Sequence, residues 1–195
     1  MSFKKINPEL KEVMSSIGID EPNDFQTLMI PKIKSGANLF GIAPKEAGKT
    51  TTIVISVLNK LNYSSVGDNP RAVIFVKDRQ AALNLEERFK EFLGRKELRI
   101  FPLYEEGDLT HQKNTIYPGM DIIIATSKRF SKLYFLNGVN LSELQMVVIE
   151  DADFMTRGTA HTDIDRIAES LKKCQYLVFA ENYDSKLARL KDLFM

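Results

Sequence analysis

Asn38-Leu-Phe-Gly-Ile-Ala-Pro-Lys-Glu-Ala-Gly-Lys-Thr-Thr-Thr52 is the stretch that decides the fold of this 195-residue chain. The apolar run from Leu39 to Ala43 predicts a buried strand, and the mainly apolar Thr51–Leu61, which lacks Gly and Pro, predicts a helix. A strand, a tight turn and Gly-Lys-Thr opening a helix form the setting that a phosphate-binding loop requires. Free N–H groups and the helix dipole at such a helix start favour an anion.

The residue types in this loop predict a nucleotide site. We expect Lys49 to reach the outer phosphates and the Thr50 hydroxyl to bind Mg²⁺. Inside the turn, Glu46 places a carboxylate where close approach of backbone to phosphate favours glycine, so nucleotide affinity stays open. The predicted nucleotide-binding residues of the loop are Ala47, Gly48, Lys49, Thr50 and Thr51.

Length and composition indicate one ordinary domain, which we assign to residues 1–195, with N-terminal helices in 1–36. A net charge of +1 gives no overall basic field, so any nucleic-acid surface must be a local patch. The one cysteine, Cys174, excludes an internal disulfide and is expected to be buried. The N-terminus has no apolar signal region and no run could span a membrane, so we expect a cytoplasmic protein without a membrane partner.

Short apolar runs alternate with amphipathic segments along the rest of the chain. The first helix is expected to start at Asn7-Pro8, and Ser127–Leu136 is expected to be helical. In contrast, the polar residues 105–120 predict an irregular segment, and neither His111 nor His161 is assigned a role. Further strands are predicted at Ala72–Val76, Ile100–Tyr104, Asp121–Ala125, Met146–Ile149 and Tyr176–Ala180.

Two helix starts near the C-terminus are predicted from their polar residues. Thr162, with Asp165 three residues later, is expected to cap a helix that points Ile164 and Ile167 inward. Asp184 is expected to cap a last helix.

This alternation predicts an α/β fold with a parallel sheet covered by helices on both faces. Ligands of such sheets bind at the carboxyl ends of the strands. We therefore expect one edge of the sheet to carry the phosphate loop, Asp78-Arg79, Thr126, Glu150–Asp153 and Glu181-Asn182.

The order of these motifs resembles the N-terminal RecA-like core domain of DEAD-box RNA helicases, over nearly the whole chain. Gly18–Pro22 followed by Gln26 is similar to the adenine-reading segment of that family, and Ala43–Thr50 to its phosphate loop. Glu150-Asp151-Ala152-Asp153 resembles Asp-Glu-Ala-Asp with the first two acids exchanged. The resemblance implies ATP and Mg²⁺ as cofactors, Gln26 as an adenine contact, Glu150 as a second Mg²⁺ contact, and Glu150, Asp151 and Asp153 as catalytic residues with impaired spacing.

A second set of motifs resembles the RNA-gripping segments of the family. Val76–Gln80 keeps the arginine of Pro-Thr-Arg-Glu, and Ala125–Arg129 keeps the threonine and arginine of Ala-Thr-Pro-Gly-Arg. Glu105-Glu106 stands where the family usually has Gly-Gly, and Ala180–Asn182 stands at its Ser-Ala-Thr motif. The implied RNA contacts are Arg79, Thr126, Lys128 and Arg129.

Three hypotheses follow. The first is a degenerate DEAD-box-like domain that binds nucleotide weakly and associates with RNA or an RNA-processing partner. The second is an active helicase half that a second RecA-like domain completes in trans. The third is a protein-interaction module without a ligand, suggested by Glu46 and Glu105-Glu106 where anions should bind.

Overall fold

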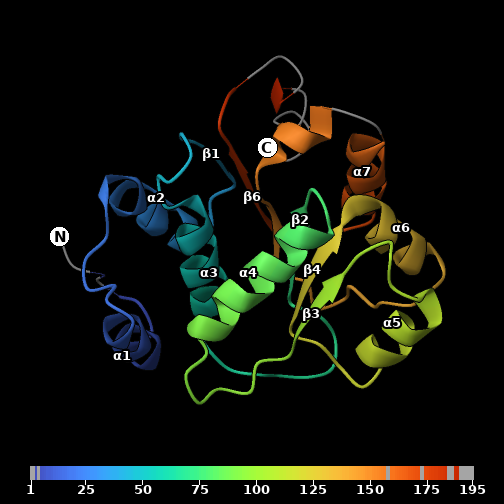
Figure 1. Cartoon of the computed structure of the whole chain (residues 1–195), viewed down its shortest axis with the longest axis horizontal. Helices are drawn as coiled ribbons and strands as arrows, with labels where there is room; N and C mark the ends of the chain where they lie inside the picture. The colour runs from blue at the N-terminus through green and yellow to red at the C-terminus, as the bar shows by residue number, and fades with distance from the viewer. Residues whose placement is uncertain (1–2, 4, 157–158, 172–173, 184–186, 189–195) are drawn as a thin grey trace.

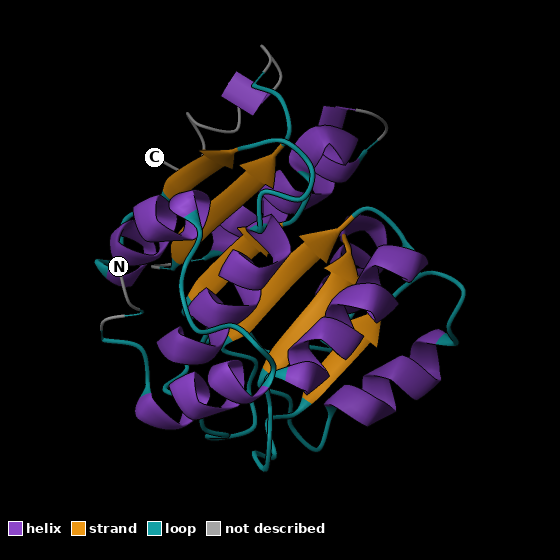
Figure 2. Cartoon of the chain, turned by 60° about the vertical axis from the view of Figure 1, so that its left-hand side comes forward, coloured by secondary structure: helices purple, strands orange, loops and turns teal. Residues whose placement is uncertain are grey.

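The computed structural model describes residues 3, 5–156, 159–171, 174–183 and 187–188. Its strands form one parallel six-stranded sheet in the order β1-β6-β5-β2-β4-β3, and their arrows run in the same direction in Figure 2. The predicted parallel α/β architecture is therefore confirmed. The strands are β1 (Leu39–Ile42), β2 (Ala72–Val76), β3 (Ile100–Leu103), β4 (Ile122–Thr126), β5 (Met146–Ile149) and β6 (Gln175–Ala180).

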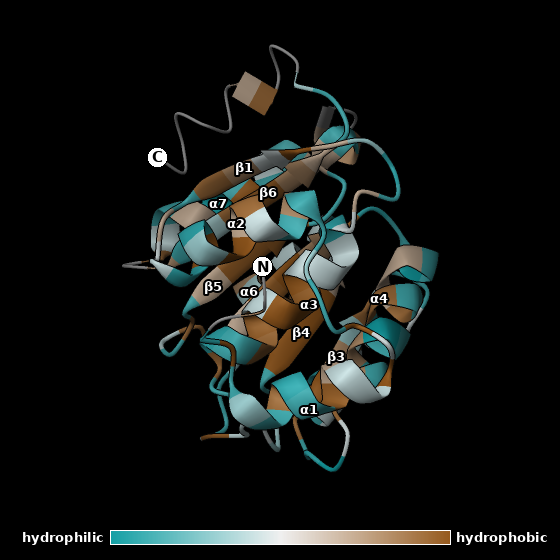
Figure 3. Cartoon of the chain, turned by 90° about the vertical axis from the view of Figure 1, so that its left-hand side faces the viewer, coloured by the Kyte–Doolittle hydropathy of each residue, from teal (hydrophilic) through white to brown (hydrophobic). Residues whose placement is uncertain are grey.

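The strands are mainly apolar because helices cover both faces of the sheet. Alternate residues of β2 belong to two separate cores: Ile74 packs with the helices of the N-terminal half, and Phe75 packs with those of the C-terminal half. Figure 3 shows the hydrophobic strands between the two helical layers, and Figure 1 shows the order of the helices. The helices are α1 (Pro8–Ser16), α2 (Asp24–Lys34), α3 (Lys49–Lys60), α4 (Arg79–Glu91), α5 (Leu109–Ile116), α6 (Ser127–Phe135), the 3-10 helix η1 (Ala152–Thr156) and α7 (Ala160–Ser170).

The segment 105–120, expected to be irregular, contains helix α5 instead. Asp108 caps this helix by accepting a hydrogen bond from the N–H of His111 at 2.7 Å. Ile116 and Gln112 face inward on it, although the segment is polar on average. The prediction was wrong because two inward positions sufficed to dock a short helix.

The predicted cap of α7 was also wrong. The N-cap is Thr159 and Thr162 lies inside the helix, where Asp165 pairs with His161 rather than with a cap. Cys174, expected to be buried, is only half-buried. The expected cap at Asp184 lies outside the described residues.

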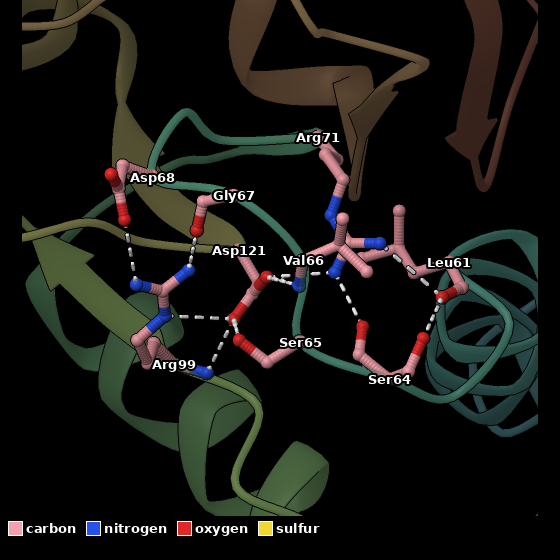
Figure 4. A network of polar contacts seen from close by, with 9 residues as sticks. All are labelled: Leu61, Ser64, Ser65, Val66, Gly67, Asp68, Arg71, Arg99 and Asp121. Atoms are coloured by element: carbon pink, nitrogen blue, oxygen red, sulfur yellow. Dashed lines mark hydrogen bonds and ion pairs between the residues drawn. The ribbon is translucent and has the colours of Figure 1, made fainter.

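A buried ion-pair network ties the amino ends of the strands together (Figure 4). The Asp121 side chain, fully buried just before β4, accepts hydrogen bonds from Arg71 Nη2 (2.7 Å) and from Arg99 Nε (3.1 Å). It also accepts from the Ser65 hydroxyl and from the backbone N–H groups of Val66 and Arg99. Although burial opposes ionisation, these donors lower the pKa of Asp121 to about 2.

No helix in the described part of the chain is long and apolar enough to cross a membrane.

Candidate functional site

The turn between β1 and α3 has the backbone of an anion-binding loop. Gly48 is the N-cap of α3 with φ of 87°, and no side chain caps this helix start. The φ of Gly48 favours glycine, and a Cβ there would lie 2.7 Å from Asn23 Nδ2, so that side chain would have to shift. The uncapped first turn of α3 leaves its N–H groups directed toward a ligand position.

Lys49 is buried within this loop, and its side chain hydrogen-bonds to the loop backbone. Its Nζ donates hydrogen bonds to the carbonyl oxygens of Ala43 (2.7 Å) and Pro44 (2.9 Å). The Lys49 amine therefore lies over the turn, at the position that the sequence predicted for the outer phosphates. Binding of a phosphate there requires Lys49 to exchange these acceptors for phosphate oxygens.

Glu46 occupies a backbone conformation that suits glycine. Its φ is 64°, in the left-handed region that costs an ordinary residue roughly 1–2 kcal/mol, and its side chain is exposed. Lys45 does not neutralise this carboxylate, since its Nζ lies 3.8 Å from Oε1 of Glu181. The loop therefore keeps the glycine-type turn that the resemblance implied, with a glutamate built into it.

The structure brings the two predicted Mg²⁺ residues together. The Thr50 hydroxyl donates to Oε1 of Glu150 at 2.7 Å, across the ends of α3 and β5. Burial raises the pKa of Glu150 to about 7, while the hydrogen bond from Thr50 opposes that rise. Next to it, Asp151 has φ of 49°, and Asp153 Oδ2 accepts the N–H of Glu181 at 3.0 Å.

Magnesium would have few ligands from the protein here. Among the described residues, no three His, Cys, Asp or Glu side chains lie close enough together to hold a metal ion. Mg²⁺ at phosphate sites is commonly held by one or two protein groups, with phosphate and water supplying the rest. Thr50 and Glu150 fit that donor set.

The predicted adenine-reading residue, Gln26, lies against the phosphate loop. It is buried and belongs to a capping box with Asn23, each side chain accepting the backbone N–H of the other residue. Asn23 Nδ2 also donates to the carbonyl oxygen of Ala47 at 3.1 Å, which joins α2 to the loop. Thr51 differs from expectation in one respect: its hydroxyl accepts a hydrogen bond from Arg88 (3.1 Å), leaving the backbone N–H to serve a ligand.

Three of the four predicted RNA contacts converge on the segment after β3. The Thr126 hydroxyl donates to Oε2 of Glu105 at 2.6 Å, and Arg129 donates to the carbonyl oxygens of Glu105 and Gly107. The Arg79 guanidinium lies 5.1 Å from the centre of the Tyr104 ring. Lys128, the fourth predicted contact, is exposed on α6.

Asn23 and the direct contact of Glu105 with Thr126 were not predicted from the sequence. Asn23 was visible as a capping box, because Asn is followed three residues later by Gln and then by an apolar run. The Glu105 contact had no sequence signal, since it joins residues that are 21 positions apart.

The family model for the DEAD/DEAH box helicase domain matches residues 23–182. The chain belongs to this family. The matched segment runs from Asn23, which supports the phosphate loop, to the residues after β6. It thus includes the DEAD-box motifs quoted from the sequence, except the segment that precedes Asn23.

The relatives are ATP-dependent RNA helicases. The chain is 26% identical over its whole length to the ATP-dependent RNA helicase DeaD of Buchnera aphidicola subsp. Schizaphis graminum, and covers 32% of that protein. It is 32% identical over 76% of its length to the ATP-dependent RNA helicase DBP10 of Phaeosphaeria nodorum, covering 17% of it. The chain therefore spans a third or less of these two relatives.

Solved DEAD-box structures share the fold. A DEAD box protein from the hyperthermophile Methanococcus jannaschii superposes with a TM-score of 0.90 at 20% identity, covering all of this chain and 54% of that one. The RNA helicase Prp28 from Chaetomium thermophilum bound to ADP gives a TM-score of 0.87 at 19% identity, with 48% of its chain covered. The RecA-like DEAD-box fold is thereby confirmed.

Proposed function

We propose that this DEAD-box domain binds MgATP weakly, hydrolyses it slowly and acts mainly by association with RNA or with an RNA-processing protein. The observation that carries this proposal is the 2.7 Å hydrogen bond between Thr50 and Glu150. The family motif has the shorter aspartate at position 150. The extra methylene of glutamate brings the carboxylate to 2.7 Å from the hydroxyl oxygen that would bind Mg²⁺, which leaves less room for the ion between the two groups than an aspartate would.

The loop nevertheless fits a phosphate group. Gly48 takes the left-handed backbone angle of such a loop, the start of α3 is uncapped, and the Lys49 amine lies over the turn. Lys49 and the N–H groups of the first turn would hold the phosphates, and Thr50 with Glu150 would hold Mg²⁺. When bound, MgATP supplies the phosphoanhydride bond and the cation that neutralises phosphate charge. Gln26 would contact the base from the neighbouring helix.

Slow hydrolysis follows from the exchanged acids. Asp151 stands where the family has the glutamate that positions the attacking water, and its side chain is one methylene shorter. Misplacement of a catalytic group by about 1 Å can cost roughly 100-fold in rate. The φ of 49° at Asp151 sets the direction of its side chain but does not make the side chain longer.

Weak RNA binding follows from the contacts of the second face. An RNA phosphate that takes the Thr126 hydroxyl must displace the Glu105 carboxylate, whose charge also repels it. Arg129 is already bound to two backbone carbonyls, which leaves Arg79 and Lys128 as the accessible cations of the predicted set. A cytoplasmic location remains a prediction.

Titration with a fluorescent ATP analogue and Mg²⁺ tests the proposal. We expect saturable binding that Lys49→Ala abolishes and that the reversal Glu150→Asp with Asp151→Glu strengthens several-fold. Lys32→Ala, which removes an exposed lysine on α2, is the matched control and should leave binding unchanged. Equal binding by the parent and Lys49→Ala, or a reversal that gains no affinity, would contradict the proposal.

A second candidate is an ATPase that needs a second RecA-like domain. The link between Asp153 and Glu181 favours it, because it joins the two strand ends that carry the acidic motif and the Ser-Ala-Thr position. Single-turnover ATP hydrolysis with RNA and fractionated cell extract distinguishes the candidates. Turnover in one fraction supports a partner domain, and background rates in every fraction exclude it.

A further inference from the structure

Lys77 is the first residue after β2, at the same edge of the sheet as the phosphate loop. β2 lies next to β5 in the sheet, and Phe75 is in register with Ile149, the last residue of β5. The N–H of Glu150 donates to the carbonyl oxygen of Phe75 at 2.9 Å. The chain therefore leaves β2 and β5 side by side, which places Lys77 next to the acidic motif.

The Lys77 side chain is exposed and is not held by another part of the fold. Among the described residues, it makes no hydrogen bond and has no carboxylate within ion-pair distance. Its charge nevertheless acts on Glu150. Burial raises the pKa of the Glu150 carboxyl to about 7, and the positive charges of Lys77 and Lys49 both oppose that rise. The Lys77 ammonium is thus within electrostatic reach of the same carboxyl group as the phosphate-loop lysine.

The order of the strands places Lys77 beyond Glu150 as seen from the phosphate loop. The loop follows β1, Glu150 follows β5 and Lys77 follows β2, and these strands lie in the order β1-β6-β5-β2. In the proposed function, the phosphates extend from the loop toward Thr50 and Glu150, where Mg²⁺ would bind the outermost one. A cation beyond Glu150 is therefore near the end of a triphosphate and farther from the end of a diphosphate held by the loop.

Negative charge surrounds the expected position of the outermost phosphate. Glu150 and Asp151 follow β5, and Glu46 lies within the phosphate loop. These carboxylates repel a triphosphate more than a diphosphate, because the triphosphate carries more negative charge. Lys77 offsets this repulsion where it is largest. It stands where the family motif Pro-Thr-Arg-Glu has proline, so the family pattern does not supply this cation.

We propose that Lys77 is a specificity-determining residue of the nucleotide site, which pairs with the outermost phosphate and makes this domain prefer ATP to ADP. The inference rests on the proposed function, because it requires the loop to hold the inner phosphates. RNA is the competing ligand, since Arg79 lies two residues further on. However, the Arg79 guanidinium lies over the Tyr104 ring, on the β3 side of β2, whereas the charge of Lys77 acts on Glu150, on the β5 side.

Titration with fluorescent analogues of ADP and of a non-hydrolysable ATP, each with Mg²⁺, tests this inference. Lys77→Met should weaken binding of the triphosphate about fivefold, the upper range for an exposed ion pair, and change binding of the diphosphate by less than about twofold. Lys77→Arg keeps the charge and should retain the preference of the parent. Lys32→Met, which removes an exposed lysine on α2, is the matched control and should leave both affinities unchanged.

The same titrations separate this inference from the proposed function. If Lys49→Ala abolishes binding but Lys77→Met leaves the ratio of the two affinities unchanged, the role of Lys77 is wrong and the proposed function stands. Equal losses for both nucleotides, or loss of the preference in Lys77→Arg, would also overturn it. If the parent binds neither nucleotide, both proposals fail. Oligouridine is titrated in parallel, and an effect of Lys77→Met on oligouridine alone would assign this cation to RNA instead.

Discussion

Replacing Asp121 by Asn tests whether the buried ion-pair network holds the amino ends of the strands together. The substitution keeps the shape of the side chain but removes the charge that faces Arg71 and Arg99 (Figure 4). Removing one partner of a buried pair typically costs 3–5 kcal/mol, because the remaining charges are left uncompensated. We expect a loss of about 3 kcal/mol or more in the free energy of unfolding at pH 7.

The pH dependence separates the charge of Asp121 from its packing. The folded-state pKa is lowered from 3.8 to about 2, which corresponds to about 2 kcal/mol of stabilisation by the ionised form. Because the pKa is depressed, this stabilisation is complete above pH 4 and is lost as the pH falls from about 4 toward 2. The difference in stability between the parent and Asp121→Asn should therefore shrink by about 2 kcal/mol over that range.

Urea denaturation followed by far-ultraviolet circular dichroism measures this, since the chain has no tryptophan to report by fluorescence. Asp68→Asn is the matched control. Asp68 also faces Arg99, with its Oδ1 3.6 Å from Nη1, but its side chain is 82% exposed. The control should change stability by less than about 0.5 kcal/mol. If the difference between the parent and Asp121→Asn is the same at pH 7 and pH 3, the assigned role of the charge is wrong.

Three further substitutions test the ligand sites. Glu46→Gly should raise the unfolding free energy by up to about 1 kcal/mol, because glycine suits φ of 64°. It should also tighten binding of the ATP analogue, and an unchanged melting temperature and affinity would contradict both expectations. Glu105→Ala should strengthen binding of oligouridine several-fold in anisotropy assays, because it frees the Thr126 hydroxyl. The control Glu106→Ala removes the same charge from the neighbouring residue and should have a smaller effect. Equal effects would show that only net charge matters. Lys49→Met should lower the melting temperature even without nucleotide, because two loop carbonyls lose their donor, and a stability equal to the parent would refute that contact.

The sheet could be predicted from the sequence because each strand is a short apolar run between polar turns. Ala72–Val76 and Met146–Ile149 were predicted with the bounds that the structure gives, since both faces of these strands are buried and no alternation blurs them. Helix α5 was missed because its inward face comprises little more than Ile116 and Gln112. The N-cap residue Asp108 is a local signal for the start of this helix, but it is lost when the polarity is averaged over the whole segment.

The predicted site residues meet where the topology of a parallel sheet requires, but their partners could not be predicted. Strand order brings Thr50 beside Glu150, although 100 positions separate them in the chain. The sequence indicated that the exchanged acids have altered spacing. It could not show that Glu150 would accept a hydrogen bond from the Thr50 hydroxyl, because that bond depends on the distance between α3 and β5.

The same physical change has occurred at both predicted ligand sites. Thr50, which faces the expected Mg²⁺ position, and Thr126, which faces the expected RNA position, each donate to a glutamate of this chain, at 2.7 and 2.6 Å. Both glutamates stand where the DEAD-box pattern has a shorter residue, aspartate at 150 and glycine at 105. An RNA phosphate that accepts from the Thr126 hydroxyl must therefore replace an existing hydrogen bond, whereas Thr50 keeps its lone pairs for a cation and Glu150 instead takes up space beside them. Since a hydrogen bond contributes about 0.5–1.5 kcal/mol net, the replacement at Thr126 would remove up to about tenfold in RNA affinity, while the backbone of both sites is kept. The weak ligand binding that we propose for this DEAD-box scaffold therefore rests on two side-chain lengths and requires no change of fold.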